Sequence, residues 1–309
     1  MLRGPRFDLD ALRPDPTAIG DVSAPTFAIV PDPRSLFSDR AQRLRTYGGV
    51  SPMKLYLDFV ADIAQAQSET VLSQGWAPTD VMAARRASTF GMPPIDRVRL
   101  ASDATIISTL HQFLDRLEHF VMPVAAVTAL HRVRHAAKEE TQAWQRSVLE
   151  GGSLVDELAE HALVAAGLQV HLATLAAGLD PSALSPVGDG VCPACGGAPV
   201  ASIIVDRANA HGNRYCVCSM CATQWNFVRI RCCSCGSTKG VGYQEIDGAN
   251  GTIKAETCDE CGTYVKVMYE NLDTTIEATA DDIGTLALDL LMKDGPYRRA
   301  AYNPFLLRF

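Results

Sequence analysis

All ten cysteines of this 309-residue chain lie between residues 192 and 261, and eight of them form four Cys-x-x-Cys pairs. The last two pairs repeat the first two with an offset of 40 residues, which is typical of a duplicated structural unit. Four thiols in two such pairs per unit are the usual donors of a tetrahedral metal site. The predicted ligands are Cys192, Cys195, Cys218 and Cys221 in the first unit, and Cys232, Cys235, Cys258 and Cys261 in the second.

Short segments rich in β-branched and aromatic residues separate the cysteine pairs and predict a small ribbon in each unit. The expected strands are 199–205, 214–217 and 225–230 in the first unit, and 241–246, 252–257 and 264–269 in the second. Glycine and asparagine between the first two strands of each unit favour a tight turn. Ribbons of this size bury little apolar surface, so we expect their folding to depend on bound metal.

Other uses of the cysteines are less consistent with the pattern. Four closely spaced pairs without a secretion signal argue against disulfides. A thioredoxin-type redox motif would need one pair at a strand-to-helix junction. Cys216 and Cys233 have no partner in the repeat, and we expect them to be passive neighbours; an alternative ligand or a reactive thiol stays open. Spacing alone does not separate iron from zinc, because both accept four thiolates.

Several residues accompany the cysteine pairs and add to the pattern: Pro193, Ala194, Gly196, Ser219, Met220, Trp225, Val228, Arg229, Arg231, Ala255, Glu256, Thr257, Tyr264 and Lys266. Across 192–269 these motifs resemble the FdhE family of formate dehydrogenase accessory proteins. The resemblance implies tandem rubredoxin-like folds with two mononuclear four-cysteine iron sites. It also implies a cytoplasmic role in maturing formate dehydrogenase by binding its catalytic subunit.

The remainder of the chain predicts helices. Residues 1–34 are proline-rich and predict an extended arm, 35–180 a helical domain, and 181–191 a linker. Within the helical domain we expect, among others, a helix starting at Asp103, one helix over 124–150, and two helices meeting at Gly167 and Leu168.

After the first unit (192–230) and the second (231–270), residues 271–309 predict a helix starting at Asp281 and Asp282, with these acids favourable to the helix dipole, and an apolar tail. The expected fold is α+β: a multi-helical N-terminal domain, two tandem rubredoxin-like, zinc-ribbon-like units and a C-terminal helix.

The helical region offers one further candidate metal site. His131, His135 and Glu139 are spaced to share one helix face, but the charged residues around them favour a solvated surface. The chain contains no Walker A loop, G-x-G-x-x-G, G-x-S-x-G or H-E-x-x-H motif, so nothing in it calls for an enzyme.

Charge and hydropathy limit the partners. The formal net charge is −7, and the cysteine-rich block has seven basic and seven acidic residues, whereas a nucleic-acid-binding zinc ribbon should be basic. No apolar run of about 20 residues predicts membrane insertion, and the N-terminus lacks a signal-peptide core. We therefore expect a cytoplasmic protein that binds a partner polypeptide, with Arg229 and Arg231 as candidate contacts. The alternatives are a rubredoxin-like electron-transfer protein and a zinc-ribbon nucleic-acid-binding protein.

Overall fold

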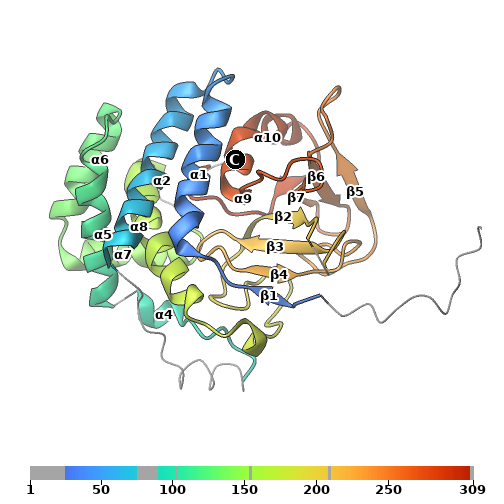
Figure 1. Cartoon of the computed structure of the whole chain (residues 1–309), viewed down its shortest axis with the longest axis horizontal. Helices are drawn as coiled ribbons and strands as arrows, with labels where there is room; N and C mark the ends of the chain where they lie inside the picture. Colours follow the sequence, from blue (N-terminus) through green and yellow to red (C-terminus); the bar gives the residue numbers. More distant parts are fainter. Residues whose placement is uncertain (1–24, 75–89, 102, 153–154, 208–209, 307–309) are drawn as a thin grey trace, which may run out of the picture.

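The computed structural model describes residues 25–74, 90–101, 103–152, 155–207 and 210–306. Helices fill one half of the molecule, and a mixed sheet fills the other (Figure 1). The helices precede the two four-cysteine units in the chain, and two short helices follow them. The expected α+β class and the order of its parts are therefore confirmed.

The helical half is built largely from segments with one apolar face. Its elements are α1 (Pro33–Gly48), α2 (Lys54–Gln74), α4 (Arg97–Leu100), α5 (Ala104–Leu117), α6 (Val124–His135), α7 (Lys138–Leu149), η2 (Val155–Glu157) and α8 (Leu158–Ala177). Asp103 caps α5 as expected, since its side chain accepts a hydrogen bond of 2.8 Å from the Thr105 backbone N–H. The apolar face of α5 then packs into the main core of the molecule.

Helix α8 runs through the centre of this half, and the prediction of two helices meeting at Gly167 is wrong. A Cβ atom at Gly167 would lie 2.7 Å from Cδ1 of Leu110. The glycine therefore permits close packing of α8 on α5 and does not end the helix. By length and composition α8 would also pass as a membrane span, but 78% of that window is buried within the molecule, as in the core helix of a globular protein.

The expected helix over 124–150 is likewise two helices. Ala136 and Ala137 have ψ angles of 147° and 152°, which are extended values, and they separate α6 from α7. Alanine favours helix, so local propensity does not explain this break. Both helices pack on α8, and the bend lets each lie against it. Glu139 therefore belongs to a different helix from His131 and His135.

The two cysteine units share one continuous sheet in the described part of the chain. Its strands follow the order β1 (Ala28–Ile29), β4 (Gln224–Asn226), β3 (Arg214–Cys218), β2 (Pro199–Ile204), β7 (Thr263–Tyr269), β6 (Ile253–Cys258) and β5 (Val241–Gln244), with β8 (Arg298–Arg299) beside β7. Pairing is antiparallel within each unit. The units join where β2 runs parallel to β7, with Ser202 opposite Val267.

The ends of the first unit differ somewhat from expectation. The strand predicted over 225–230 ends at Asn226, and Val228 and Ile230 are exposed. Strand β1 extends the sheet, because Ala28 pairs with Trp225. This strand comes from the predicted proline-rich arm, of which residues 1–24 lie outside the described residues. The segment predicted as a linker includes the short turn η3 (Pro181–Ala183).

The C-terminal segment forms α9 (Ala278–Gly284) and α10 (Leu286–Lys293) in place of the single helix expected. Asp281 lies in the first turn of α9, as expected, and accepts a hydrogen bond of 2.8 Å from the Glu277 backbone N–H. Asp281 and Asp282 are also buried ion-pair partners. Asp281 accepts hydrogen bonds of 2.6 Å from the guanidinium of Arg43 and from the hydroxyl of Tyr47, both on α1. The apolar tail beyond α10 packs on the body, with Phe305 buried.

Asp282 faces the opposite way, toward the sheet. The ammonium of Lys266 on β7 lies 3.3 Å from Asp282 and 2.5 Å from Asp289 of α10, and Arg299 of β8 pairs with both carboxylates. Burial alone would raise the pKa of Asp282, but Lys266 and Arg299 outweigh it and hold that pKa below its usual range. The cluster ties the sheet to the C-terminal helices by charge in a site without solvent access.

The substitution Lys266→Met should lower the free energy of unfolding by about 3–5 kcal/mol, because it leaves two buried carboxylates with one cation. Lys254→Met on the neighbouring strand β6 is the control. Its partner Glu245 is largely accessible to solvent, and a pair of this kind contributes about 0.2–1 kcal/mol. Denaturant unfolding of both variants measures the difference, and equal losses would contradict a special role for the buried cluster.

Candidate metal centres

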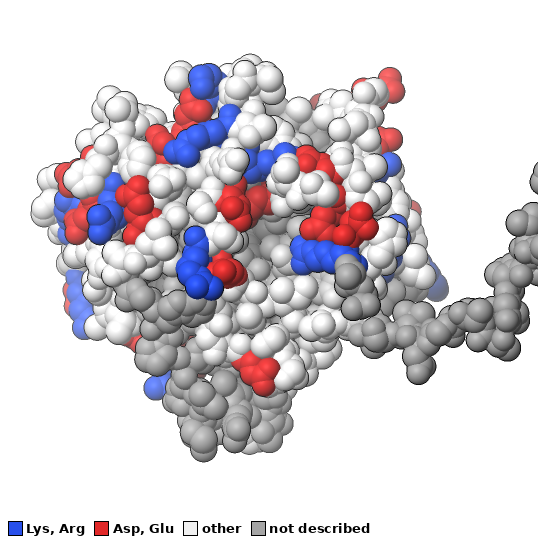
Figure 2. Space-filling model, viewed as in Figure 1, with Lys and Arg blue, Asp and Glu red and all other residues white. Residues whose placement is uncertain are grey.

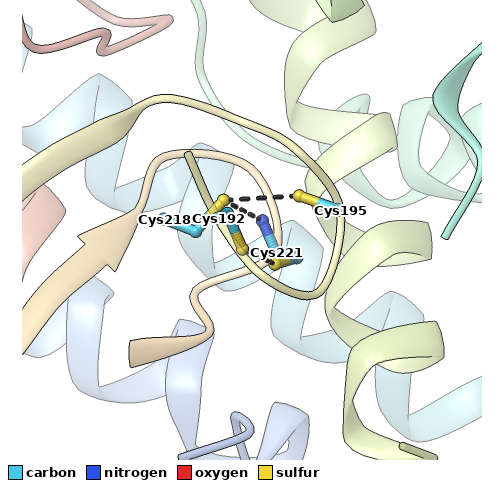
Figure 3. Close-up of side chains that lie close together, drawn as sticks. All are labelled: Cys192, Cys195, Cys218 and Cys221. Carbon is cyan, nitrogen blue, oxygen red and sulfur yellow. Dashed lines mark hydrogen bonds between the residues drawn. The ribbon is translucent and has the colours of Figure 1, made fainter. Parts of the chain in front are cut away.

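The structure brings the first set of predicted cysteines together beside the start of β2 and the end of β3. The sulfur of Cys192 lies 3.6 Å from that of Cys221, and the sulfur of Cys195 lies 3.5 Å from that of Cys218. All four sulfur atoms lie within 4.8 Å of one another. Figure 3 shows the four side chains converging from two loops on one point. We name this cluster centre 1.

The second set forms an equivalent cluster beside β6 and β7, which we name centre 2. Here the sulfur of Cys232 lies 3.8 Å from that of Cys261, and the sulfur of Cys235 lies 3.8 Å from that of Cys258. A tetrahedron with metal–sulfur bonds of 2.3 Å has sulfur atoms about 3.8 Å apart. The donor type and the spacing at both centres therefore fit a four-coordinate metal ion that prefers thiolates.

The backbone of the two centres repeats as closely as the cysteine positions do. The N–H of Cys192 donates to the carbonyl of Gly197 at 2.9 Å, and the N–H of Cys232 donates to that of Ser237 at 2.8 Å. We call the Cys-x-x-Cys loops of each unit its first and second knuckle. Each first knuckle ends in a glycine with φ of 75°, Gly196 or Gly236. Each second knuckle ends in the same left-handed conformation, with Ala222 at 58° and Gly262 at 63°. Both units therefore use one loop geometry to aim two sulfur atoms inward.

Two threonines belong to this arrangement and were missed in the sequence. The hydroxyl of Thr223 lies 3.2 Å from the sulfur of Cys221, and that of Thr263 lies 3.0 Å from the sulfur of Cys261. Backbone N–H groups add to them, since Met220 and Ser234 each donate to a knuckle sulfur at 3.4 Å. Backbone N–H donors of this kind stabilise thiolates, whereas the Cys221 thiol donates to the Thr223 hydroxyl. The 40-residue offset relates the two threonines as it relates the cysteines, and this signal could have identified them.

The pKa shifts of the clustered thiols indicate that four thiolates at centre 1 would need a cation between them. Burial raises the pKa of Cys192 and Cys221 well above the usual range. Burial also opposes ionisation of Cys218, but hydrogen bonds from the other thiols outweigh it and hold the pKa of Cys218 well below that range. Four thiolates at these separations repel one another, and a metal ion between them would offset that repulsion while displacing their protons.

The two unpaired cysteines lie outside both clusters. Cys216 and Cys233 are buried neighbours: their contact lowers the pKa of Cys216 and raises that of Cys233. Next to them Arg214 pairs with Glu256 at 2.8 Å, and both of these side chains are buried. The thiols thus occupy the space between the first unit and the start of the second.

Arg229 and Arg231, the candidate partner contacts, follow β4 at the point in the chain where the first unit ends and the second begins. Arg229 is exposed and donates weakly to the Gly212 carbonyl at 3.4 Å. Arg231 is held more firmly, by a hydrogen bond of 2.9 Å to the Gly236 carbonyl and a salt bridge of 2.9 Å to Asp189. Trp225 nearby is buried and belongs to the main apolar core.

The alternative site on the helices is not assembled. The rings of His131 and His135 lie with centroids 4.2 Å apart on α6, and Glu139 lies beyond the bend on α7. Within the described residues, the groups that could hold a metal ion are the two cysteine clusters. The structure therefore concentrates metal-binding chemistry in the sheet.

Family models match nearly the whole chain in three consecutive parts. The model of the FdhE N-terminal region matches residues 25–189, that of the FdhE central domain matches 191–229, and that of the FdhE C-terminal domain matches 230–306. These three matches cover the helical half, the first cysteine unit, and the second unit with the C-terminal helices.

Curated relatives and a solved structure agree with these matches. A protein named FdhE homolog from Rhizobium meliloti is 44% identical over 308 residues, which is 98% of this chain and all of the relative. An FdhE homolog from Stutzerimonas stutzeri is 34% identical over 92% of this chain and 93% of its own. The crystal structure of FdhE from Pseudomonas aeruginosa is 30% identical and superposes with a TM-score of 0.83, covering 92% of this chain and 99% of that one. The chain belongs to the FdhE family.

Proposed function

We propose that this protein is a cytoplasmic accessory factor for the assembly of formate dehydrogenase, and that it binds the catalytic subunit of that enzyme. The observation that carries the proposal is the family match across residues 25–306, together with two preformed four-cysteine clusters on one sheet. The role requires recognition of a polypeptide and no turnover of a substrate, so we propose that the protein is not an enzyme.

We further propose that each cluster binds one iron ion through its four cysteines. The ligands would be Cys192, Cys195, Cys218 and Cys221 at centre 1, and Cys232, Cys235, Cys258 and Cys261 at centre 2. When bound, the metal would cross-link two loops of each unit and hold the surrounding surface rigid. A rigid surface loses little conformational entropy when a partner binds, which favours recognition.

The junction of the two units is the proposed docking surface, which we call the junction surface: Val228, Arg229, Ile230, Arg231 and Tyr243. Val228 and Ile230 are 58% and 68% exposed, and Tyr243 is 47% exposed. The Tyr243 hydroxyl contacts the Arg229 carbonyl at 3.4 Å, so the surface includes both units. Apolar side chains beside arginine are common at protein interfaces.

Charge supports a protein partner over nucleic acid. In the view of Figure 2, Lys and Arg lie interspersed with Asp and Glu, many in direct pairs, and no broad basic surface forms. The salt bridges of Arg132 to Glu140 and of Arg207 to Glu270 are examples of such pairing. A phosphate backbone requires a concentrated positive field.

Electron transfer is the second candidate, and the exposure of Cys235 at centre 2 is the observation that favours it. Iron held by four thiolates changes oxidation state readily, and an exposed ligand shortens the path to a redox partner. A reversible iron couple that a physiological donor reduces would favour this role over assembly.

The metal content tests the proposed sites directly. Protein purified without added metal should contain two iron ions per chain, with thiolate-to-iron charge-transfer bands and no inorganic sulfide. Elemental analysis and absorption spectra measure this. One metal ion per chain, or sulfide in stoichiometric amount, would contradict two mononuclear centres.

Substitution of the ligands tests the assignment of each sulfur. Cys→Ser at any of the eight paired positions should remove the metal of that centre only, because a hydroxyl is a poor replacement for a thiolate. Cys216→Ser and Cys233→Ser are matched controls from the same units and should keep both metals. Equal metal loss in all ten variants would mean that the ligand sets are wrong.

Deletion of the gene should abolish formate dehydrogenase activity, and a tagged copy of this protein should capture the catalytic subunit from extracts. The double variant Val228→Asp, Ile230→Asp should lose capture by about tenfold or more, because charge is unfavourable in an apolar contact. Val121→Asp, at a valine on the helical half that is 92% exposed, should retain it. Full activity without the gene and no capture of the subunit would exclude the assembly role.

A further inference from the structure

The two centres have the same geometry but different surroundings. At centre 1 all four cysteines are buried, with the most exposed of them at 2%. At centre 2 Cys235 is exposed and Cys261 is partly exposed, while Cys232 and Cys258 are buried. Access to the sulfur atoms is therefore the main difference between two clusters that otherwise match.

The helical half covers the first knuckle of centre 1. The N–H of Ile95 donates to the Ala194 carbonyl at 3.0 Å, and Arg97 donates from Nη1 to the Gly196 carbonyl at 3.1 Å. Pro93 lies directly over the same glycine, since a Cβ there would be 3.4 Å from its ring. This knuckle thus lies beneath the segment that leads into α4.

The core helix covers the second knuckle of centre 1. Gln169 on α8 donates from Nε2 to the Ser219 carbonyl at 2.7 Å, in a buried hydrogen bond. Met220 at the tip of this knuckle is 2% exposed and belongs to the main apolar core. Centre 1 is consequently sealed on both sides by the helical half.

The corresponding positions of centre 2 are polar and face solvent. Ser234 takes the place of Ala194, and Asp259 and Glu260 take the places of Ser219 and Met220; all three are exposed. The hydroxyl of Tyr297 donates to Asp259 at 2.6 Å, but this contact is itself exposed. The 40-residue repeat has thus kept the sulfur donors and changed the residues that would exclude water.

We propose that the two centres differ in function: centre 1 is a sealed structural site, and centre 2 is an exchangeable site that thiophilic metal ions enter and leave through Cys235. The inference rests on the proposal that both clusters bind metal. Cys232, Cys235, Cys258 and Cys261 would hold the ion at centre 2, and the exposed Cys235 thiolate would be the ligand that a chelator replaces first and that solvent then protonates. No electron is transferred.

Centre 1 can lose its metal in this way only after the helical half moves away from its two knuckles. Opening separates the helical half from the first unit, which exposes the apolar core around Met220, so it is a rare local unfolding event. Metal loss from centre 1 should therefore be slower than loss from centre 2 by about a hundredfold or more.

The test uses full-length protein loaded with zinc, after elemental analysis has shown two zinc ions per chain. Excess of a chromogenic chelator should remove zinc in two phases of equal amplitude. Alkylation with iodoacetamide between the phases, followed by peptide mass spectrometry, should label Cys235 and its three partners and leave the centre 1 cysteines unlabelled. A single phase, or labelling of centre 1 first, would overturn the inference while leaving metal binding intact; absence of zinc would instead contradict the proposed metal sites.

Two variants of α4 test the cover itself. Arg97→Ala removes the hydrogen bond to the Gly196 carbonyl and should speed the slow phase about tenfold, with the fast phase unchanged. Arg99→Ala is the control, since Arg99 lies exposed on the same helix. The inference fails if Arg97→Ala changes the fast phase instead, or if both variants behave as the unsubstituted protein.

Discussion

Two adjacent carboxylates on α9 hold the parts of this molecule together. Asp281 points to α1 and its neighbour Asp282 points to the sheet, so one short helix binds the helical half and the cysteine units by charge. Both carboxylates are buried, and each would be costly there without its cations. These contacts help to fix the sheet relative to the helices, together with the shared apolar core and the hydrogen bonds of Ile95, Arg97 and Gln169 to the loops of centre 1.

The sequence was informative where the signal is local. Paired cysteines at a fixed offset predicted both sulfur clusters, because a Cys-x-x-Cys loop determines its own geometry over a few residues. Strands β2, β3, β6 and β7 lie close to their predicted ranges for the same reason, since runs of β-branched and aromatic residues bounded by turn residues are local properties. The start of α5 at Asp103 follows from one side chain and its own backbone.

The errors arose where distant contacts decide the structure. Gly167 resembles a helix end by itself, and only the approach of Leu110 shows that the glycine permits packing. Ala136 and Ala137 favour helix locally, yet the packing of α6 and α7 on α8 bends the chain there. Asp281 does lie in the first turn of α9, but the local sequence does not reveal the buried ion pairs that Asp281 and Asp282 make. Their partners are Arg43, Lys266 and Arg299. None of these partners lies within one helical turn in sequence.

Because β2 pairs with β7, each cysteine unit depends on the other to complete its sheet. Each unit supplies the strand that covers an edge of the other, so a chain cut between them would expose unpaired backbone N–H and carbonyl groups along both strands. Such open edges pair readily with other chains and promote aggregation. The two copies can therefore carry different surfaces, but a change that disrupts this pairing in one unit leaves a strand edge of the other unit unpaired.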